Sequence, residues 1–363
     1  MDTAFLPKYV PEFRLPKDCD SWLDIAKNLS IYNERNSIVP IVESMQYVDY
    51  TVLRTCQEQR FAYVVLSMIA NSYLRLKKTG KTNVLPRNLA VPLWNIAKTI
   101  GISPVVTHAG LDLWNYKLID DTKPFEVENL SQLVSFTGSD DEKYFCCIMT
   151  EIEHIGTIVY DKLISIKDLI KKDDVDGIIN ILKMFSENIL NITKALDKMF
   201  TGCRPDYFFN VIRPYLAGWQ NEGLIFEGVS DEVTHYKGGS AAQSSLIQLF
   251  DIVLGVYHES PFFAEMRNYM PKTHREILEK LAEEMDEFKL SDYVYESPND
   301  SLRDIYKKCV DLLAKFRAKH MEIAHKYITK MIPKNVNAVG TGGEDIKEFL
   351  KTAKNETLQL IKN

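Results

Sequence analysis

Residues 301–331 are the stretch that most constrains how this chain can fold. Apolar side chains recur there at steps of three and four, the spacing that aligns one face of an α-helix, so we predict a single long amphipathic helix. His320 lies on the apolar face, whereas His325 points about 140° away and is predicted to face solvent. The apolar face comprises Leu302, Ile305, Cys309, Leu312, Leu313, Phe316, Ile323, Ala324 and Tyr327.

The histidine on this face has two interpretations. A lone histidine among apolar neighbours is usually a core residue whose ring nitrogens find local hydrogen-bond partners. The alternative is a heme ligand, and Arg317, one helical turn earlier, could then reach an anionic group of the bound cofactor. The helical pattern leaves both interpretations open.

Length and charge narrow the class of protein. The 363 residues exceed the usual size of a single core. A loop rich in Asp, Gly and Ser at residues 136–143 is a natural boundary, so we expect a small N-terminal helical domain at 1–136 and a larger C-terminal helical domain at 137–363. The net charge is −6, without a long basic block, so neither nucleic acid nor a membrane is an expected partner.

Other features indicate a cytoplasmic protein. The most apolar run, residues 61–70, is half the length that spans a bilayer and is predicted to be a core helix. The first residues lack a basic region followed by an apolar one, so we expect no secretion signal. The six cysteines are scattered and form neither a disulfide framework nor a zinc motif.

Helical periodicity dominates from residue 21 onward, and strand alternation is hard to find, so the predicted class is all-α. We expect a helix from about residue 50 to 76 and another whose first residue is Pro92 and which Gly101 closes. A further helix is predicted at residues 104–119. Pro214 should kink its segment next to Arg213.

Two further segments of the chain contain glycines. Ser240 followed by Gln243 is typical of a capping box, here before an apolar helix that Gly255 ends. The GTGG sequence at residues 340–343 is too short to bind a phosphate and indicates a mobile loop before a last helix. Nucleotide-binding loops, nucleophile elbows and zinc-protease histidine pairs are missing from the sequence.

Several separated segments resemble the indoleamine 2,3-dioxygenase family and occur in the family's order. They are LPRNLAVP (85–92), FFNVIRPYLAGW (208–219), GGSAAQSSLIQLFDIVLG (238–255) with YMPKTHR (269–275), FRAKHMEIAHKYI (316–328) and GTGGEDIKEFLKT (340–352). The resemblance implies an all-helical protein that encloses heme b. It also implies an enzyme that adds both atoms of O2 across the C2–C3 bond of the tryptophan indole, giving N-formylkynurenine at the start of the kynurenine pathway.

The same resemblance implies ferrous heme in the active state, a cellular reductant and a monomer. His320 matches the family's heme ligand, and Arg317 matches an arginine beside the heme propionates. Asp251 would support that arginine, or else be an ordinary acid on the helix surface. Gly239, Ser240 and Ala241 match a loop of small residues against the heme, where close approach requires little side chain.

Further matches concern the substrate. Arg213 matches the arginine that binds the substrate carboxylate, a task that suits its planar fork of donors. Phe208 and Phe145 match aromatic residues at the indole, and Thr341 matches a loop over the amino-acid end. Leu111 falls in the same indole pocket.

The chain departs from the family's usual pattern at His108, Asp112 and Met149, where a tyrosine, a small aliphatic residue and a serine are frequent. His108 and Asp112 are four residues apart and could pair beside the indole, or they could turn outward into solvent. Met149 would fill volume on the same side.

These departures keep rival functions open. His108 could donate a hydrogen bond to O2, as in an O2-binding heme protein on the same scaffold that lacks efficient dioxygenase activity. A helical interaction module that has lost heme is a further alternative.

Overall fold

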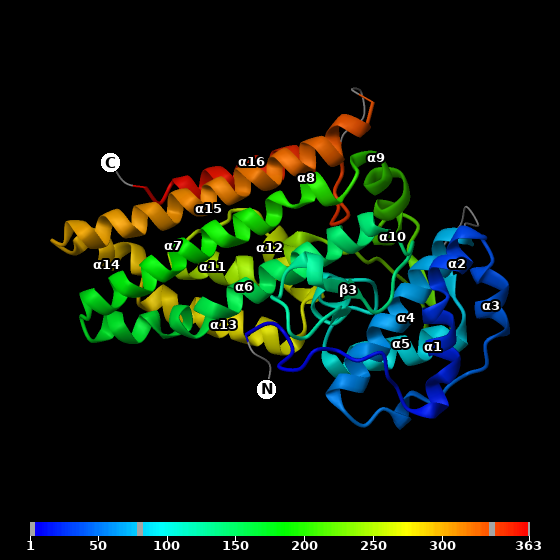
Figure 1. Ribbon diagram of the computed structural model, residues 1–363. Coiled ribbons are helices and arrows are strands. Elements are labelled where there is room, and N and C mark those ends of the chain that lie inside the picture. The colour runs from blue at the N-terminus through cyan, green and yellow to red at the C-terminus, as the bar shows by residue number, and fades with distance from the viewer. Residues whose placement is uncertain (1–3, 78–82, 334–337, 362–363) are drawn as a thin grey trace.

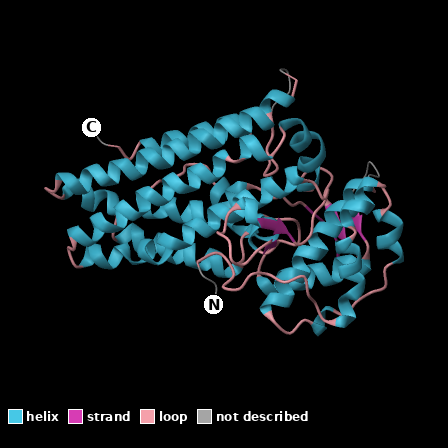
Figure 2. Ribbon diagram, in the orientation of Figure 1, coloured by secondary structure: helices cyan, strands magenta, loops and turns pink. Residues whose placement is uncertain are grey.

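The computed structural model describes residues 4–77, 83–333 and 338–361. Most of this part of the chain is helical, as Figure 2 shows, and the predicted all-α class is confirmed. Strands occur as short segments in two small sheets. Within the described ranges, no helix combines the length and apolar character that crossing a bilayer requires.

The N-terminal helices gather at one end of the molecule, around the buried helix α4 (Figure 1). Side chains 61–74 of α4 are all buried, which confirms the predicted core helix. The helices are α1 (Asp20–Lys27), α2 (Leu29–Glu34), α3 (Ile38–Ser44), α4 (Cys56–Leu76) and α5 (Arg87–Ile100).

Two predicted helix starts were wrong. Helix α4 begins at Cys56 and not near residue 50, because Thr55 and Glu58 form a capping box with each other's backbone N–H groups. Helix α5 begins after Pro86, so Pro92 lies inside it and not at its first position. Its predicted end is confirmed, because Gly101 adopts the left-handed conformation with φ 68°.

The predicted helix at residues 104–119 is also wrong. The chain there forms a π-helical turn at Ala109–Leu113, followed by strand β2 (Tyr116–Leu118), which pairs antiparallel with β3 (Leu130–Gln132). The Tyr63 hydroxyl donates to the carbonyl oxygen of Ser103 at 2.9 Å, and it also contacts Val105 and Thr107. These tertiary hydrogen bonds occupy backbone groups that a helix would have used.

Long helices lie side by side in the rest of the molecule (Figure 1). Helix α7 packs between α6 and α15, and α16 packs along α15. The long helix predicted at residues 301–331 is confirmed as α15, which a short 3-10 turn follows, and His325 is exposed as expected. The long helices are α6 (Asp140–Lys171), α7 (Val175–Asp197), α15 (Asp300–Tyr327) and α16 (Ile346–Leu358).

The remaining elements complete this part of the molecule. The helices are α8 (Met199–Gly202), α9 (Pro205–Tyr207), α10 (Arg213–Leu216), α11 (Ser245–Leu254), α12 (Phe262–Met266), α13 (Lys272–Glu287) and α14 (Leu290–Glu296). Strand β4 (Leu224–Phe226) pairs parallel with β1 (Asn83–Leu85) and antiparallel with β5 (Ser230–Thr234). The division into domains at residues 136 and 137 stays a prediction.

Two local features predicted from proline and serine bear on the site. A π-helical turn at Phe208–Ile212 leads into α10, which has Pro214 in its first turn, so the helix type changes at Arg213; the kink expected from Pro214 stays a prediction. The capping residue of α11 is Ser244 and not Ser240, because the Ser244 hydroxyl accepts from the N–H of Ile247. Ser240 instead begins a 3-10 turn, and Gly255 ends α11 as predicted.

Candidate functional site

Two cavities meet at His320, on the inner side of α15. Both are bordered by His320, Ala241, Ala242, Phe349 and Leu350. The first cavity extends towards α6 and is lined mainly by apolar side chains. The second extends towards Arg213 and the GTGG loop. Helices α15 and α16 and the loop before α11 therefore form a shared wall.

The His320 imidazole is suited to binding a metal. Burial, together with the nearby Arg317 guanidinium, lowers the pKa of His320 to about 4, so the ring is neutral at neutral pH. None of the described residues forms a hydrogen bond with it. A neutral ring with an available lone pair is the form in which histidine coordinates metals. The interpretation of His320 as an ordinary core residue required local partners, and the described structure supplies none.

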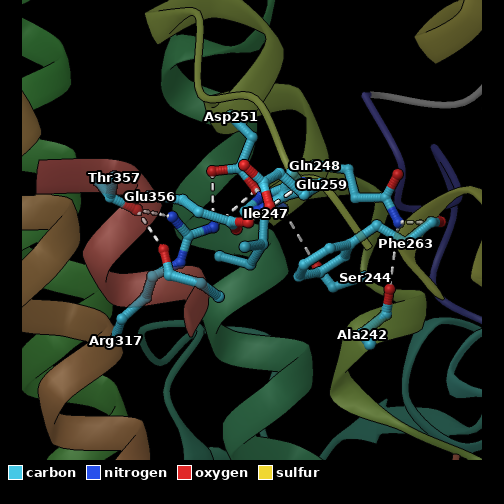
Figure 3. Close-up of polar contacts among 12 residues, drawn as sticks. Ala242, Ser244, Ile247, Gln248, Asp251, Glu259, Phe263, Arg317, Glu356 and Thr357 are labelled. Atoms are coloured by element: carbon cyan, nitrogen blue, oxygen red, sulfur yellow. Dashed lines mark hydrogen bonds and ion pairs between the residues drawn. The ribbon is translucent and has the colours of Figure 1, made fainter. Parts of the chain in front are cut away.

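A buried ionic network that includes Arg317 joins α15, α11 and α16 (Figure 3). Arg317 Nη2 lies 2.6 and 2.7 Å from the two carboxylate oxygens of Asp251, and Arg317 also donates to the Thr357 hydroxyl. His258 bridges Asp251, at 3.1 Å, and Glu356, at 2.5 Å. Asp251 is 3% exposed, so it is not an acid on the helix surface.

The pKa values of Asp251 and His258 both shift towards the charged form. Burial alone would raise the pKa of Asp251, but the charges and hydrogen bonds of Arg317 and His258 outweigh burial and lower it. Burial alone would lower the pKa of His258, and its hydrogen bonds to the two acids raise it instead. Asp251 is therefore a carboxylate that holds Arg317 at the edge of the first cavity.

The loop before α11 brings small residues to the shared wall. Gly239 and Ser240 line the second cavity, and Ala241 lines both. A Cβ on Gly239 would lie only 3.1 Å from Leu111 Cδ1, so this backbone is already close to its neighbour. Gln248 holds the loop through its amide, which donates to the carbonyl oxygens of Ala242 and Phe263 (Figure 3).

This arrangement fits heme, the cofactor that the sequence implies. Heme is a flat, largely apolar group that carries two carboxylates. It therefore needs an apolar slot, a neutral histidine for the iron and a cation near the carboxylates. The first cavity offers apolar walls, the neutral His320 ring and the Arg317 guanidinium. Ala241 and Ala242 present only methyl groups to the same space.

The second cavity gathers the residues expected at the substrate. It is bordered by Phe145, Phe208, Arg213 and Thr341. The rings of Phe145 and Phe208 are 4.8 Å apart, centre to centre. Arg213 donates to the carbonyl oxygen of Val339, its Nε has no partner among the described residues, and burial lowers its pKa. Thr341 donates to the carbonyl oxygen of Gly239 at 2.6 Å, which ties the GTGG loop to the small-residue loop.

His108 and Asp112 pair with each other and do not turn outward. His108 Nδ1 lies 2.7 Å from Asp112 Oδ2, and both side chains are buried. His108 Nε2 lies 3.0 Å from Glu153 Oε1, so both ring nitrogens face carboxylates. Burial alone would lower the pKa of His108, but these hydrogen bonds outweigh it and raise the pKa to about 10. His108 and Met149 line the first cavity, whereas Leu111, Asp112 and Asp251 line neither cavity.

Sequence reasoning missed Glu153, Ser244, His258 and Glu356. Glu153 is four residues after Met149, so helical spacing places it on the same face and could have identified it. His258 and Glu356 are 98 residues apart, and no local pattern connects them. Their pairing depends on how α16 packs.

Comparisons with known proteins agree over nearly the whole chain. Residues 1–360 match the family model described as indoleamine 2,3-dioxygenase. Indoleamine 2,3-dioxygenase 2 of Mus musculus is 31% identical, covering 96% of this chain and 90% of its own length. Indoleamine 2,3-dioxygenase of Saccharomyces cerevisiae is 30% identical, covering 98% and 90%. The 6-hydroxytryptophan 2,3-dioxygenase fscD of Fusarium equiseti is 30% identical, covering 99% and 96%.

Proposed function

This chain belongs to the indoleamine 2,3-dioxygenase family, and from that premise we propose that it is a heme dioxygenase acting on L-tryptophan or a related indoleamine. The reaction adds O2 across the C2–C3 bond of the indole and yields N-formylkynurenine. One observation carries the proposal: the neutral imidazole of His320, which has no hydrogen-bond partner among the described residues, lies where an apolar cavity meets a second cavity that contains Arg213.

Heme would be held by His320 at the iron and by Arg317 near its carboxylates, and when bound it supplies the O2 chemistry. Arg213 would bind the substrate carboxylate through two parallel hydrogen bonds, for which its Nε is available. Phe145 and Phe208 would fix the plane of the indole. Thr341 and the small-residue loop would close the amino-acid end and exclude water.

The wider setting is part of the same proposal. The active state would contain ferrous heme, take O2 as co-substrate and depend on a cellular reductant. We infer a monomer in the cytoplasm, and the six free cysteines agree with a reducing compartment. The alternative of an O2 carrier depended on His108 as a donor to O2. Because both His108 ring nitrogens face carboxylates, no observation favours that alternative.

The test begins with the absorption spectrum of the purified protein after reconstitution with hemin. We expect a Soret band that His320→Ala removes or shifts, and that His325→Ala, an exposed position on the same helix, leaves unchanged. Reduced protein supplied with L-tryptophan and O2 should then form N-formylkynurenine, detected by its absorbance. A protein without a Soret band, or a His320→Ala spectrum identical to that of the wild type, would refute the proposal.

A further inference from the structure

A buried cluster of one imidazole and two carboxylates borders the first cavity, where the proposed function places heme. The His108 ring lies between Asp112 and Glu153, at 2.7 and 3.0 Å, and each of the three side chains is at most 6% exposed. His108 and Glu153 line the cavity, whereas Asp112 does not. The Ser244 hydroxyl donates to Glu153 Oε1 at 2.6 Å, which adds a hydrogen bond but no charge. Charges buried in this way are costly unless other charges balance them.

The three groups of the cluster together carry one net negative charge, wherever their protons lie. Each ring nitrogen of His108 faces a carboxylate oxygen, so one proton lies in each of these two contacts. If both protons are on the ring, its positive charge cancels only one of the two carboxylates. If one proton is on an acid, the ring and that acid are neutral and the other acid stays charged. Neither arrangement makes the cluster neutral.

The protein does not balance this charge from its own side chains. Among the described residues, the ion pairs of Asp112 and Glu153 are with His108 and not with a lysine or an arginine. Arg317 borders the same cavity, but the carboxylate of Asp251 binds its guanidinium at 2.6 and 2.7 Å. Glu153 Oε2 is buried and accepts no hydrogen bond from the described part of the chain. The balancing charge is therefore expected from the group that the cavity binds.

Heme supplies this charge in only one of its oxidation states. The iron–porphyrin centre is positively charged when the iron is ferric and neutral when it is ferrous, so a neighbouring negative charge stabilises the ferric form. The attraction is weakly screened here, because the side chains of the cluster are buried. A negative charge at this position should therefore lower the midpoint potential of the cofactor.

We propose that the cluster of His108, Asp112 and Glu153 tunes the redox potential: its net negative charge favours ferric heme, so that the reductant of this protein is a one-electron donor of low potential. The inference rests on the proposed function and adds the chemical class of the reductant to it. Reduction transfers one electron from that donor to ferric iron, which becomes ferrous, and no bond within the cluster forms or breaks. The cluster acts through its charge and does not need to contact the substrate.

The experiment measures the ferric–ferrous midpoint potential of the full-length, heme-loaded protein by spectroelectrochemical titration of the Soret band at neutral pH. The double variant Glu153→Gln/Asp112→Asn keeps the shapes of both acids and removes both negative charges, whatever the protonation state of His108. We expect it to raise the ratio of ferrous to ferric heme at a fixed potential on the order of tenfold, which is about 59 mV for a one-electron couple.

Three single variants separate charge from packing. Glu153→Gln leaves at most the charge of Asp112, which does not border the cavity, so the potential should rise by a smaller amount. Glu153→Asp alters the packing but keeps the charge, so its potential should stay close to that of the wild type. Glu151→Gln is the matched control, because Glu151 is a buried acid on the same helix that pairs with Lys198 and lines neither cavity. Its potential should not change.

The outcomes separate the two proposals. An unchanged or lower potential in the double variant, or equal shifts in Glu153→Gln and either Glu153→Asp or Glu151→Gln, overturns this inference alone. If no variant of Glu153 takes up hemin while Glu151→Gln does, the cluster has a structural role and the inference is also wrong. A wild-type protein that shows neither a heme spectrum nor tryptophan turnover overturns the proposed function, and this inference with it.

Discussion

Replacing Asp251 with asparagine should destabilise the fold far more than its small change in size suggests. Arg317 and Asp251 have side chains that are 6% and 5% exposed, and two hydrogen bonds of 2.6 and 2.7 Å join them. Removing one partner of a buried pair leaves an uncompensated charge and costs about 3–5 kcal/mol. Asparagine keeps one acceptor oxygen, so we expect Asp251→Asn to fall near 3 kcal/mol, the lower end of that range.

The measurement is the free energy of unfolding in urea, taken from the transition midpoint at an unchanged slope. The matched control is Asp311→Asn, because Asp311 and Lys315 form an exposed pair on the helix that also carries Arg317, with side chains that are 46% and 66% exposed. An exposed pair contributes about 0–1 kcal/mol, so the two substitutions should differ by about 2 kcal/mol or more.

The same change has a second readout near the cavity. Without Asp251, Arg317 loses the carboxylate that holds it at the cavity edge, so we expect weaker retention of hemin at equal protein concentration. If Asp251→Asn and Asp311→Asn shift the urea midpoint by similar amounts, the argument from burial is wrong. A loss below about 1 kcal/mol in Asp251→Asn would lead to the same conclusion.

Three further predictions concern other parts of the molecule. Arg213→Lys keeps the charge but loses the planar fork, so the KM for L-tryptophan should rise about tenfold in steady-state kinetics, and an unchanged KM would contradict the role of Arg213. Gly156→Ala places a Cβ 2.3 Å from Leu246 Cδ2 in the core, so we expect a loss of about 1–3 kcal/mol in urea unfolding, and no loss would show that Leu246 moves aside. His108 has a pKa of about 10 in the folded state against 6.5 ordinarily, so its contribution to stability should be complete below pH 6.5 and lost as pH rises towards 10. Unfolding of the wild type and of His108→Asn across that range measures the difference, which a constant gap would contradict.

Local sequence determined the elements whose formation depends only on neighbouring residues. The apolar spacing along 301–331 predicted α15 and the side on which His320 lies. Gly101 and Gly255 predicted helix ends, because glycine adopts a positive φ without steric cost. The family segments predicted which residues would gather, and both cavities contain several of them.

Tertiary structure decided what neighbouring residues cannot encode. Residues 104–119 have the apolar spacing of a helix, yet the carbonyl oxygens of Val105 and Asn115 accept hydrogen bonds from the Tyr63 hydroxyl and from the Leu133 N–H instead. Asp251 and Arg317 are 66 residues apart, and His108 and Glu153 are 45 apart. Periodicity describes one segment at a time, whereas such partners meet only when α6, α11 and α15 pack. The sequence alone therefore identified the helix that carries His320. Only the packed structure decided that His320 and Glu153 border the same cavity.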